Sequence, residues 1–358
     1  MHIPDGYLSP ETCGAFGAVM VPFWATAARR VRKVVKSRYV PLLAIGAAYC
    51  FLVMMFNVPI PDGTTAHAVG GVLVAVLLGP WAAVVAVTSA LAIQALFFGD
   101  GGVIAFGVNC FNMALVMPMV GYTVYLGLTR GASLTSPRRA FAAGAGGYVG
   151  LNVAALCTAV EFGLQPTLFH RADGTPLYAP FHLAQTIPAM ALAHLTVAGG
   201  VEFALTAGVL AYLQRANLPL LRINHAAVPE GDADVVRGGR ASWRRALAGL
   251  GAMAVLTPLG LAAPGGAFGE DTPGNLNLKK YHLSAVPDGL RHYAGFWHHA
   301  LFNGYDFSHD KHPVIGYLAS AGFGLLVVGA AVPAVYALTR FVGRSRRARG
   351  REHHGAPA

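Results

Sequence analysis

Charged residues are scarce in this chain of 358 residues. Only 12% are Asp, Glu, Lys or Arg, whereas 55% are hydrophobic. A soluble domain usually has about 25% charged residues, so the composition argues against an ordinary water-soluble protein. The apolar residues also form long runs, and a bilayer core of about 30 Å needs roughly 20 such residues per helical crossing. The chain is therefore expected to span a membrane several times.

The apolar runs predict an all-α, polytopic membrane protein with about nine transmembrane helices. They lack the period-2 alternation of membrane barrel strands, and within lipid only helices and closed barrels satisfy the backbone. The predicted spans lie at residues 12–28, 40–57, 65–79, 81–98, 103–128, 140–163, 181–213, 245–263 and 314–340.

Acidic residues are fewer than basic ones, 16 against 26, and the net charge is +10. Nucleic acid would be one explanation, but the placement of the charge argues against it. Basic residues gather at 29–38, 130–139, 215–245 and 340–351, which all lie on one side of a nine-span chain. The positive-inside rule makes that side the cytoplasm. We expect the N-terminus outside, the C-terminus inside and no nucleic-acid partner.

Cysteine is also rare, and none of the four forms a CxxC motif or a disulfide framework. Cys13, Cys50, Cys110 and Cys157 all fall in apolar runs. We expect them to be small hydrophobic residues in helix packing.

The first two residues form a candidate metal chelate. The N-terminal stretch lacks the basic region of a signal peptide, so Met1 is expected to be the mature N-terminus. The Met1 amine, the His2 backbone nitrogen and the His2 Nδ1 can close a five-membered and a six-membered ring around an ion. Ni(II) and Cu(II) favour such tetragonal nitrogen geometry. An accidental His2 at a disordered terminus is the alternative.

His67 is the best-placed fourth donor. It lies in the predicted span 65–79, whose fifteen residues reach only about 22 Å at 1.5 Å each, so one end is recessed. Pro59, Pro61 and Gly63 favour irregular backbone before it, which is tolerated at membrane depth only beside a cavity or within protein. An outward-facing pocket is expected there. Packing without a metal role is the alternative.

Five motifs follow one another in the first part of the chain, at residues 1–10, 61–71, 78–81, 94–102 and 109–113. In this order they resemble the nickel/cobalt substrate-binding subunits of energy-coupling-factor transporters, the CbiM/NikM family, over residues 1 to about 215. The Pro4-Asp5-Gly6 form of the opening is more similar to the nickel branch.

The resemblance implies a helical bundle with the N-terminal segment plugged into its outer face and a metal ion held by Met1, His2 and His67. It also implies a transmembrane coupling subunit and a pair of cytoplasmic ATPases as partners, in a bacterial or archaeal cytoplasmic membrane. The chain has no phosphate-binding GxxxxGK[ST] loop, so it is expected to be no enzyme and to need no cofactor. Ni(II) is the expected substrate, with Co(II) for cobalamin synthesis as the alternative.

Polar residues near these motifs are expected to lie behind the ligands, because metal-bound His usually donates its other N–H to an oxygen. Interhelical hydrogen bonding without a metal role is the alternative, and Asp5 is also a candidate turn cap. These residues are Asp5, Gln94, Asp100, Asn109 and Asn112.

Two positions depart from the family pattern. Val108 precedes Asn109 where a small residue is expected, and Phe203 follows Glu202 where the family has glycine. The second departure bears on close helix packing in the seventh predicted span. Neither residue is a proposed ligand.

The chain divides into a metal-binding subunit of about seven helices (1–215), a basic cytoplasmic linker (216–243), an accessory module (244–340) and a basic cytoplasmic tail (341–358). The module has two helices around an outer loop at 264–311. Within it, residues 284–290 and Phe296-Trp297 resemble the Pro-Asp-Gly-Leu accessory module of these transporters, with Arg291 in place of the usual Glu.

Six histidines crowd the outer loop: His282, His292, His298, His299, His309 and His312. A metal-gathering vestibule and ordinary solvated side chains are both open interpretations. A membrane metalloenzyme with His boxes is a remote alternative, because such boxes project from helices into one pocket. A transporter or channel indifferent to metal does not explain the five motifs.

Overall fold

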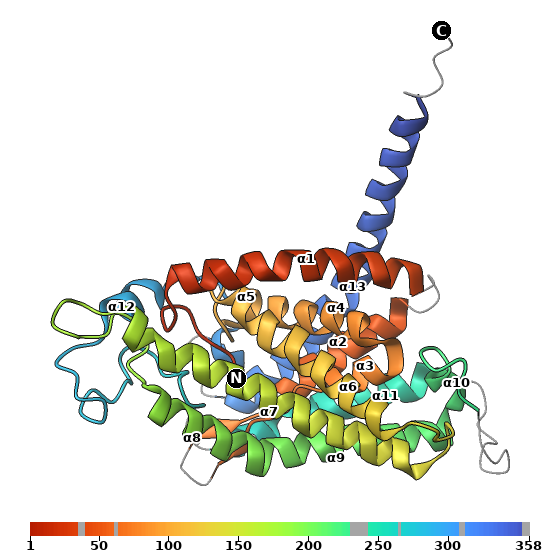
Figure 1. Ribbon diagram of the computed structural model, residues 1–358, viewed down its shortest axis with the longest axis horizontal. Coiled ribbons are helices and arrows are strands. Elements are labelled where there is room, and N and C mark those ends of the chain that lie inside the picture. The colour runs from red at the N-terminus through yellow and green to blue at the C-terminus, as the bar shows by residue number, and fades with distance from the viewer. Residues whose placement is uncertain (35–39, 61–63, 230–242, 264–265, 308–311, 353–358) are drawn as a thin grey trace.

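The chain forms a bundle of helices that run roughly parallel to one long axis (Figure 1). The structure, a computed structural model, describes residues 1–34, 40–60, 64–229, 243–263, 266–307 and 312–352. Helix α12 (Asp288–Tyr293) lies at one end of the bundle and α10 (Leu218–Leu221) at the other, and these names are used for the two ends. The predicted all-α, polytopic membrane fold is confirmed.

The longer helices are α1 (Pro10–Val34), α2 (Val40–Met54), α4 (Pro80–Ile93), α6 (Met117–Leu128), α7 (Pro137–Leu168), α8 (Leu183–Ala193), α9 (Gly199–Ala216), α11 (Trp243–Leu256) and α13 (Pro313–Glu352). The shorter ones are α3 (Gly71–Leu78), α5 (Phe106–Asn109) and the 3-10 helices η6 (Thr257–Ala262) and η7 (Asn303–Tyr305). A small hairpin pairs β1 (Val58–Pro59) with β2 (Thr65–Ala66).

Within the described ranges, six helical stretches are long and apolar enough to cross a membrane, against nine predicted spans. They are Pro80–Phe98, Phe106–Leu128, Pro137–Leu168, Leu183–Ala216, Arg244–Ala262 and Pro313–Ala334. The other three predicted spans correspond to α1, to the apolar but shorter α2 and to α3, which has only eight residues. The predicted span 65–79 is helical only from Gly71, because residues 65 and 66 pair in the hairpin and Gly70 takes a left-handed φ of 76°.

Some predicted segments fall partly on positions that the structure does not describe. The linker 216–243 contains α10 but includes residues 230–242, and the loop 264–311 includes 264–265 and 308–311, with His309. The predicted tail 341–358 is helical up to Glu352 as the end of α13, and residues 353–358 lie outside the description.

Helix α7 packs closely between α6 and α9 because glycines line both of its sides. A Cβ added to Gly146 would lie 2.4 Å from the carbonyl oxygen of Gly121 on α6. On the α9 side, a Cβ on Gly144 would lie 2.9 Å from the Phe203 ring. Small residues allow this close approach of membrane helices. The bulk of Phe203, which replaces the family's glycine, is therefore matched by a glycine on the facing helix.

Three π-helical segments adjoin α-helices of the bundle: η2 (Gln94–Phe98) after α4, η3 (Cys110–Val116) between α5 and α6, and η4 (His194–Ala198) between α8 and α9. Each contains a buried polar side chain with an acceptor atom that has no hydrogen-bond partner within the described part of the chain: Gln94 Oε1, Asn112 Oδ1 and His194 Nε2. Segments of this kind occur frequently at functional sites.

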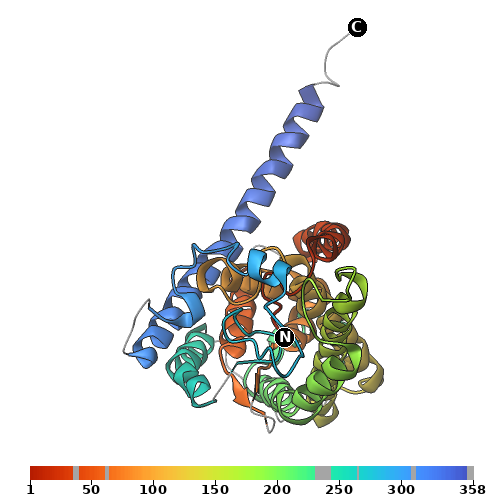
Figure 2. The ribbon, with the colours of Figure 1, turned by 90° about the vertical axis from the view of Figure 1, so that its left-hand side faces the viewer.

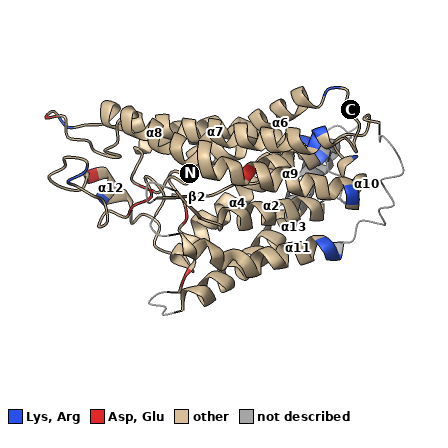
Figure 3. Cartoon of the chain, turned by 90° about the horizontal axis from the view of Figure 1, so that it is seen from below, with Lys and Arg blue, Asp and Glu red and all other residues tan. Residues whose placement is uncertain are grey.

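Basic residues gather near α10 and the start of α11, while a few more lie on the loops at the α12 end (Figure 3). One of them is buried: Arg139 is 3% exposed and donates to the Tyr125 hydroxyl at 2.7 Å and to the carbonyl oxygen of Ala132 at 2.9 Å. The α10 end is therefore the basic end of the bundle.

Candidate metal centre

The N-terminal segment enters the bundle from the α12 end, and Met1 lies inside a ring of helices (Figure 2). Met1 and His2 are only 4% and 2% exposed, and Ile3 is fully buried. The Ile3 N–H donates to Asn109 Oδ1 at 2.8 Å, and Asn109 Nδ2 donates to the Ile3 carbonyl at 3.0 Å. This two-way bond fixes the backbone directly after His2, so Asn109 positions the proposed chelate without touching its imidazole.

Asp5 anchors the same N-terminal segment three residues after His2. Its carboxylate accepts backbone N–H groups from Val103 at 3.0 Å, Ile104 at 2.8 Å and Ala105 at 3.1 Å. A Cβ on Gly102 would lie 2.0 Å from Asp5 Oδ1, so only glycine fits there. Burial raises the pKa of Asp5 although the three N–H groups act in the opposite direction. Asp5 therefore ties the N-terminal segment to the chain before α5, beyond the turn-capping role considered from sequence.

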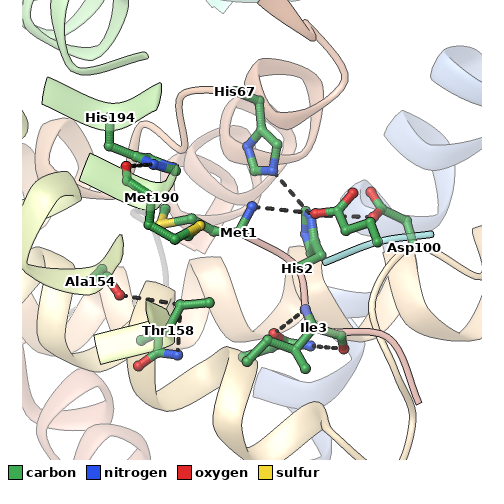
Figure 4. A network of polar contacts seen from close by, with 12 residues as sticks. Met1, His2, Ile3, His67, Asp100, Ala154, Thr158, Met190 and His194 are labelled. Carbon is green, nitrogen blue, oxygen red and sulfur yellow. Dashed lines mark hydrogen bonds and ion pairs between the residues drawn. The ribbon is translucent and has the colours of Figure 1, made fainter. Parts of the chain in front are cut away.

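His2 and His67 face each other inside the bundle (Figure 4). His67 Nε2 lies 3.1 Å from His2 Nδ1, and the two ring centroids are 4.8 Å apart. His67 Nδ1 lies 3.0 Å from the carbonyl oxygen of Ala68. Since a carbonyl only accepts, Nδ1 carries the hydrogen and Nε2 keeps its lone pair. The loop therefore directs a basic nitrogen of His67 at the nitrogen with which His2 would chelate.

Two carboxylates lie beside this pair of imidazoles. Asp100 Oδ1 is 3.2 Å from His2 Nδ1, and Glu270 Oε1 is 3.4 Å from the Met1 amine. Desolvation raises the pKa of Glu270, whereas the Met1 ammonium acts to lower it. Negative charge on two sides favours a divalent cation at the amine and the imidazoles.

The predicted supporting residues divide into two groups. Gln94 Nε2 donates to Asp100 Oδ2 at 3.4 Å and to the Tyr305 hydroxyl at 2.9 Å, so Gln94 and Asp100 belong to the surroundings of His2. Asn112 makes none of its hydrogen bonds to the proposed ligands. Its Nδ2 donates to Thr158 Oγ1 at 3.1 Å and to Glu161 Oε2 at 2.6 Å, which links η3 to α7.

Glu202 on α9 holds the loop that carries His67. The side chain is fully buried, and its Oε2 accepts the N–H groups of Val69 at 2.8 Å and Gly70 at 3.0 Å. These N–H groups directly precede α3, and the positive end of a helix favours a carboxylate. Glu202 therefore fixes the position of the loop that carries His67, although the two side chains are not in contact.

Sequence reasoning missed three residues that lie around or beside this centre. Glu270 and Tyr305 come from the irregular 266–307 segment, which carries no helical or strand periodicity that would place them near Met1. His194, which is 2% exposed and lies on η4, did have a signal, because an ionisable residue within an apolar membrane run is a functional candidate by default.

No group of three or more His, Cys, Asp or Glu side chains that could hold a metal ion occurs among the residues that the structure describes. The outer-loop histidines thus form no such group there, although the His298 and His299 rings lie 4.1 Å apart. A centre at Met1 does not need a third side chain of this kind, because the Met1 amine and the His2 amide supply two of its nitrogens.

Known proteins share this sequence and architecture. A family model described as "Cobalt uptake substrate-specific transmembrane region" matches residues 2–220. The fused nickel transport protein NikMN of Rhodobacter capsulatus is 47% identical over 96% of this chain and 100% of its own length. The probable fused nickel transport protein LarMN of Lactiplantibacillus plantarum is 46% identical over 91% of this chain and 95% of its own length.

A crystal structure described as a transition metal transporter is 52% identical, with a TM-score of 0.57, and the match covers 63% of this chain and 100% of that one. These similarities confirm the family predicted from the five motifs. The chain belongs to the CbiM family of cobalt uptake substrate-specific transmembrane proteins, and it is a multi-pass membrane subunit of a prokaryotic nickel or cobalt transporter and not an enzyme.

Proposed function

We propose that this chain is the substrate-specific subunit of an ATP-driven energy-coupling-factor importer for Ni(II). Four nitrogens hold the ion: the Met1 amine, the His2 backbone nitrogen, His2 Nδ1 and His67 Nε2. The observation that carries this proposal is the contact of 3.1 Å between His67 Nε2 and His2 Nδ1, with His67 Nδ1 bonded to the Ala68 carbonyl.

The geometry of this contact suits a nitrogen square. Metal–imidazole bonds of about 2.0–2.1 Å put neighbouring nitrogens of a square roughly 2.9 Å apart. The two imidazole nitrogens therefore need to move by only a few tenths of an ångström to share an ion. The backbone on the other side of His2 is already fixed by Asn109.

Nickel is favoured over cobalt by two observations. A square of four nitrogens is the geometry that Ni(II) accepts readily. In addition, the relatives named for nickel transport are 46–47% identical over most of the chain, whereas the cobalt transport protein CbiM of Geobacter sulfurreducens is 32% identical over 62% of it. Co(II) in the same site is the second candidate.

The placement of charge supports an orientation and a set of partners. With the basic α10 end inside, the α12 end and the entrance of the N-terminal segment face outward. We assign residues 1–215 to the substrate subunit, 216–243 to a linker, 244–340 to an accessory module and 341–358 to a tail. A transmembrane coupling subunit and two cytoplasmic ATPases would complete the importer.

The experiment is Ni(II) and Co(II) titration of the full chain, compared with a version that carries one extra residue before Met1. The extension leaves every side chain in place but removes the amine from its five-membered ring. The native form should bind one Ni(II) with a diamagnetic, square-planar spectrum, and the extended form should bind about 10- to 100-fold more weakly. Equal affinity of the two forms would exclude the N-terminal chelate.

A matched control separates loss of the amine from loss of burial, because Met1 is only 4% exposed. His2→Gln keeps the native terminus and its burial, because a bulky second residue prevents enzymatic removal of Met1, but it removes one imidazole. Both variants should lose Ni(II), while their metal-free melting temperatures should stay close to that of the native chain. A large fall in melting temperature for the extended form alone would mean that packing, not chelation, explains its weak binding.

A further inference from the structure

His194 lies beside the N-terminal centre and takes no part in the proposed chelate. It is 2% exposed, and its Nδ1 lies 2.8 Å from the carbonyl oxygen of Met190. This contact places the hydrogen on Nδ1 and leaves a lone pair on Nε2. His194 Nε2 is buried and has no hydrogen-bond partner among the residues described. The helix thus presents a metal-binding nitrogen that no protein group uses.

The position of His194 relative to Met1 makes this nitrogen relevant to the ion. Figure 4 shows His194 and Met190 on the opposite side of Met1 from His2 and Asp100. Segment η4, which carries His194, packs against β2, and β2 ends at Ala66 directly before His67. An ion leaving the chelate on the side away from Asp100 therefore meets His194.

We propose that His194 is the next ligand on the path of the ion and takes it from the N-terminal chelate through Nε2. This inference rests on the proposed function and adds a second binding position to it. The thioether sulfurs of Met1 and Met190, drawn in yellow in Figure 4, are soft, weak donors. A site with one strong donor can accept an ion and release it again.

The transfer is a ligand exchange in which the ion stays divalent. A bond from the metal to His194 Nε2 would form as the first bond to a chelate nitrogen breaks, and water would take the other positions on the ion as the remaining chelate nitrogens release it. The Met1 amine and the His2 amide take back from water the protons that they lost on loading. No oxidant or reductant is required.

One continuous helix links the two positions. Helix α8, the π segment η4 and α9 follow one another from Leu183 to Ala216. This helix presents His194 and, eight residues later, Glu202, which holds the loop of His67. A shift of the helix would therefore withdraw His67 and move His194 in the same step.

The first test compares binding with transport. His194→Gln in the full chain should bind Ni(II) within about twofold of the native affinity, because all four chelate nitrogens remain. In the complete transporter in vesicles, its Ni(II) uptake should fall about 10- to 100-fold, the usual loss when a group next to a metal site is removed. Native uptake would overturn the proposal. Loss of binding would also overturn it, because His194 would then belong to the first site.

The second test has a readout that a purely structural role would not produce. Replacing the imidazoles of His67 and His194, in His67→Ala/His194→Cys, leaves the chelate with three nitrogens and puts a thiol at position 194. Co(II) should then give a sulfur-to-metal charge-transfer band. His67→Ala/Leu195→Cys is the matched control, because Leu195 is on the same π segment and 53% exposed. It should give no band beyond that of the four native cysteines.

Absence of the band from the His194→Cys form would overturn the proposal even if uptake falls. A different result would refute the proposed function. It is equal binding of Ni(II) to the native and the extended chain, whichever residue is at position 194.

Discussion

Glu202→Ala is predicted to weaken metal binding although Glu202 touches no proposed ligand. Its Oε2 accepts the N–H groups of Val69 and Gly70 at 2.8 and 3.0 Å, and the side chain is 0% exposed. Alanine leaves both N–H groups buried without an acceptor. The loop can regain hydrogen bonds only by moving, and His67 lies two residues before Val69 on that loop.

The expected size of the effect follows from these two bonds. A buried donor without a partner costs about 1–3 kcal/mol, so the ordered loop loses roughly 2–6 kcal/mol. Apparent affinity falls in proportion to the fraction of molecules in the binding-competent arrangement. If relaxation recovers all but about 1.4 kcal/mol, binding still weakens about tenfold. We therefore expect the dissociation constant for Ni(II) to rise at least about tenfold.

Calorimetric titration of the purified full chain measures this change. Glu202→Gln is the matched variant, because its amide oxygen can still accept both N–H groups, and it should bind within a few-fold of the native chain. Thr206→Val removes only the bond from Thr206 Oγ1 to Glu202 Oε1 and should bind like the native chain. Native affinity in a folded Glu202→Ala protein would refute the role of this carboxylate in placing His67.

The remaining predictions concern the N-terminal segment and the α10 end. Asn109→Ala should speed hydrogen exchange at the Ile3 amide and weaken Ni(II) binding, because both hydrogen bonds to Ile3 are lost. Asn109→Asp keeps the acceptor, so its exchange rate and affinity should lie between those of the alanine variant and the native chain. An unchanged exchange rate in Asn109→Ala would contradict the role of Asn109 in holding Ile3. Burial, together with the charge of Arg139, lowers the pKa of His225 from 6.5 to about 4. His225 therefore binds a proton more readily in the unfolded chain than in the folded one. The contribution of neutral His225 to the free energy of unfolding is complete above pH 6.5 and is lost as the pH falls toward 4. Melting temperatures between pH 7 and 4 should show a smaller decline in His225→Gln than in the native chain.

The sequence predicted that the proposed ligands lie together, as His2 and His67 do, better than it predicted the residues that support them. Met1, His2 and His67 were placed together because chelate-ring size and the five motifs depend only on local order along the chain. Asn112, in contrast, bonds to Thr158 and Glu161. These hydrogen bonds depend on the rotation of α7 about its own axis. Packing of the small residues on two sides of α7 determines that rotation, and the hydrophobic pattern of the sequence does not predict it.

The same limit applies to the helices. Runs of about twenty apolar residues predicted the six stretches of the described chain that are helical and long and apolar enough to cross a membrane. The run at 65–79 looked like one more span, but hydrophobicity does not reveal that residues 65 and 66 pair with residues 58 and 59 or that Gly70 breaks the helix. Glu270 and Tyr305 were out of reach for a related reason, since the path of an irregular segment is set by contacts that no periodicity encodes.

The contacts of the 266–307 segment also determine when the centre is complete during synthesis. Glu270 pairs with the Met1 amine, the Tyr305 hydroxyl donates to Asp100, and the Asp271 carbonyl accepts from Tyr7. Met1 and Tyr7 therefore obtain these partners only after residue 271 has been made, and Asp100 obtains its own only after residue 305. Until then the Met1 amine lacks the carboxylate of Glu270, and Asp100 beside His2 lacks the hydroxyl of Tyr305. The order of translation makes closure of the proposed metal site one of the last events in the maturation of this protein.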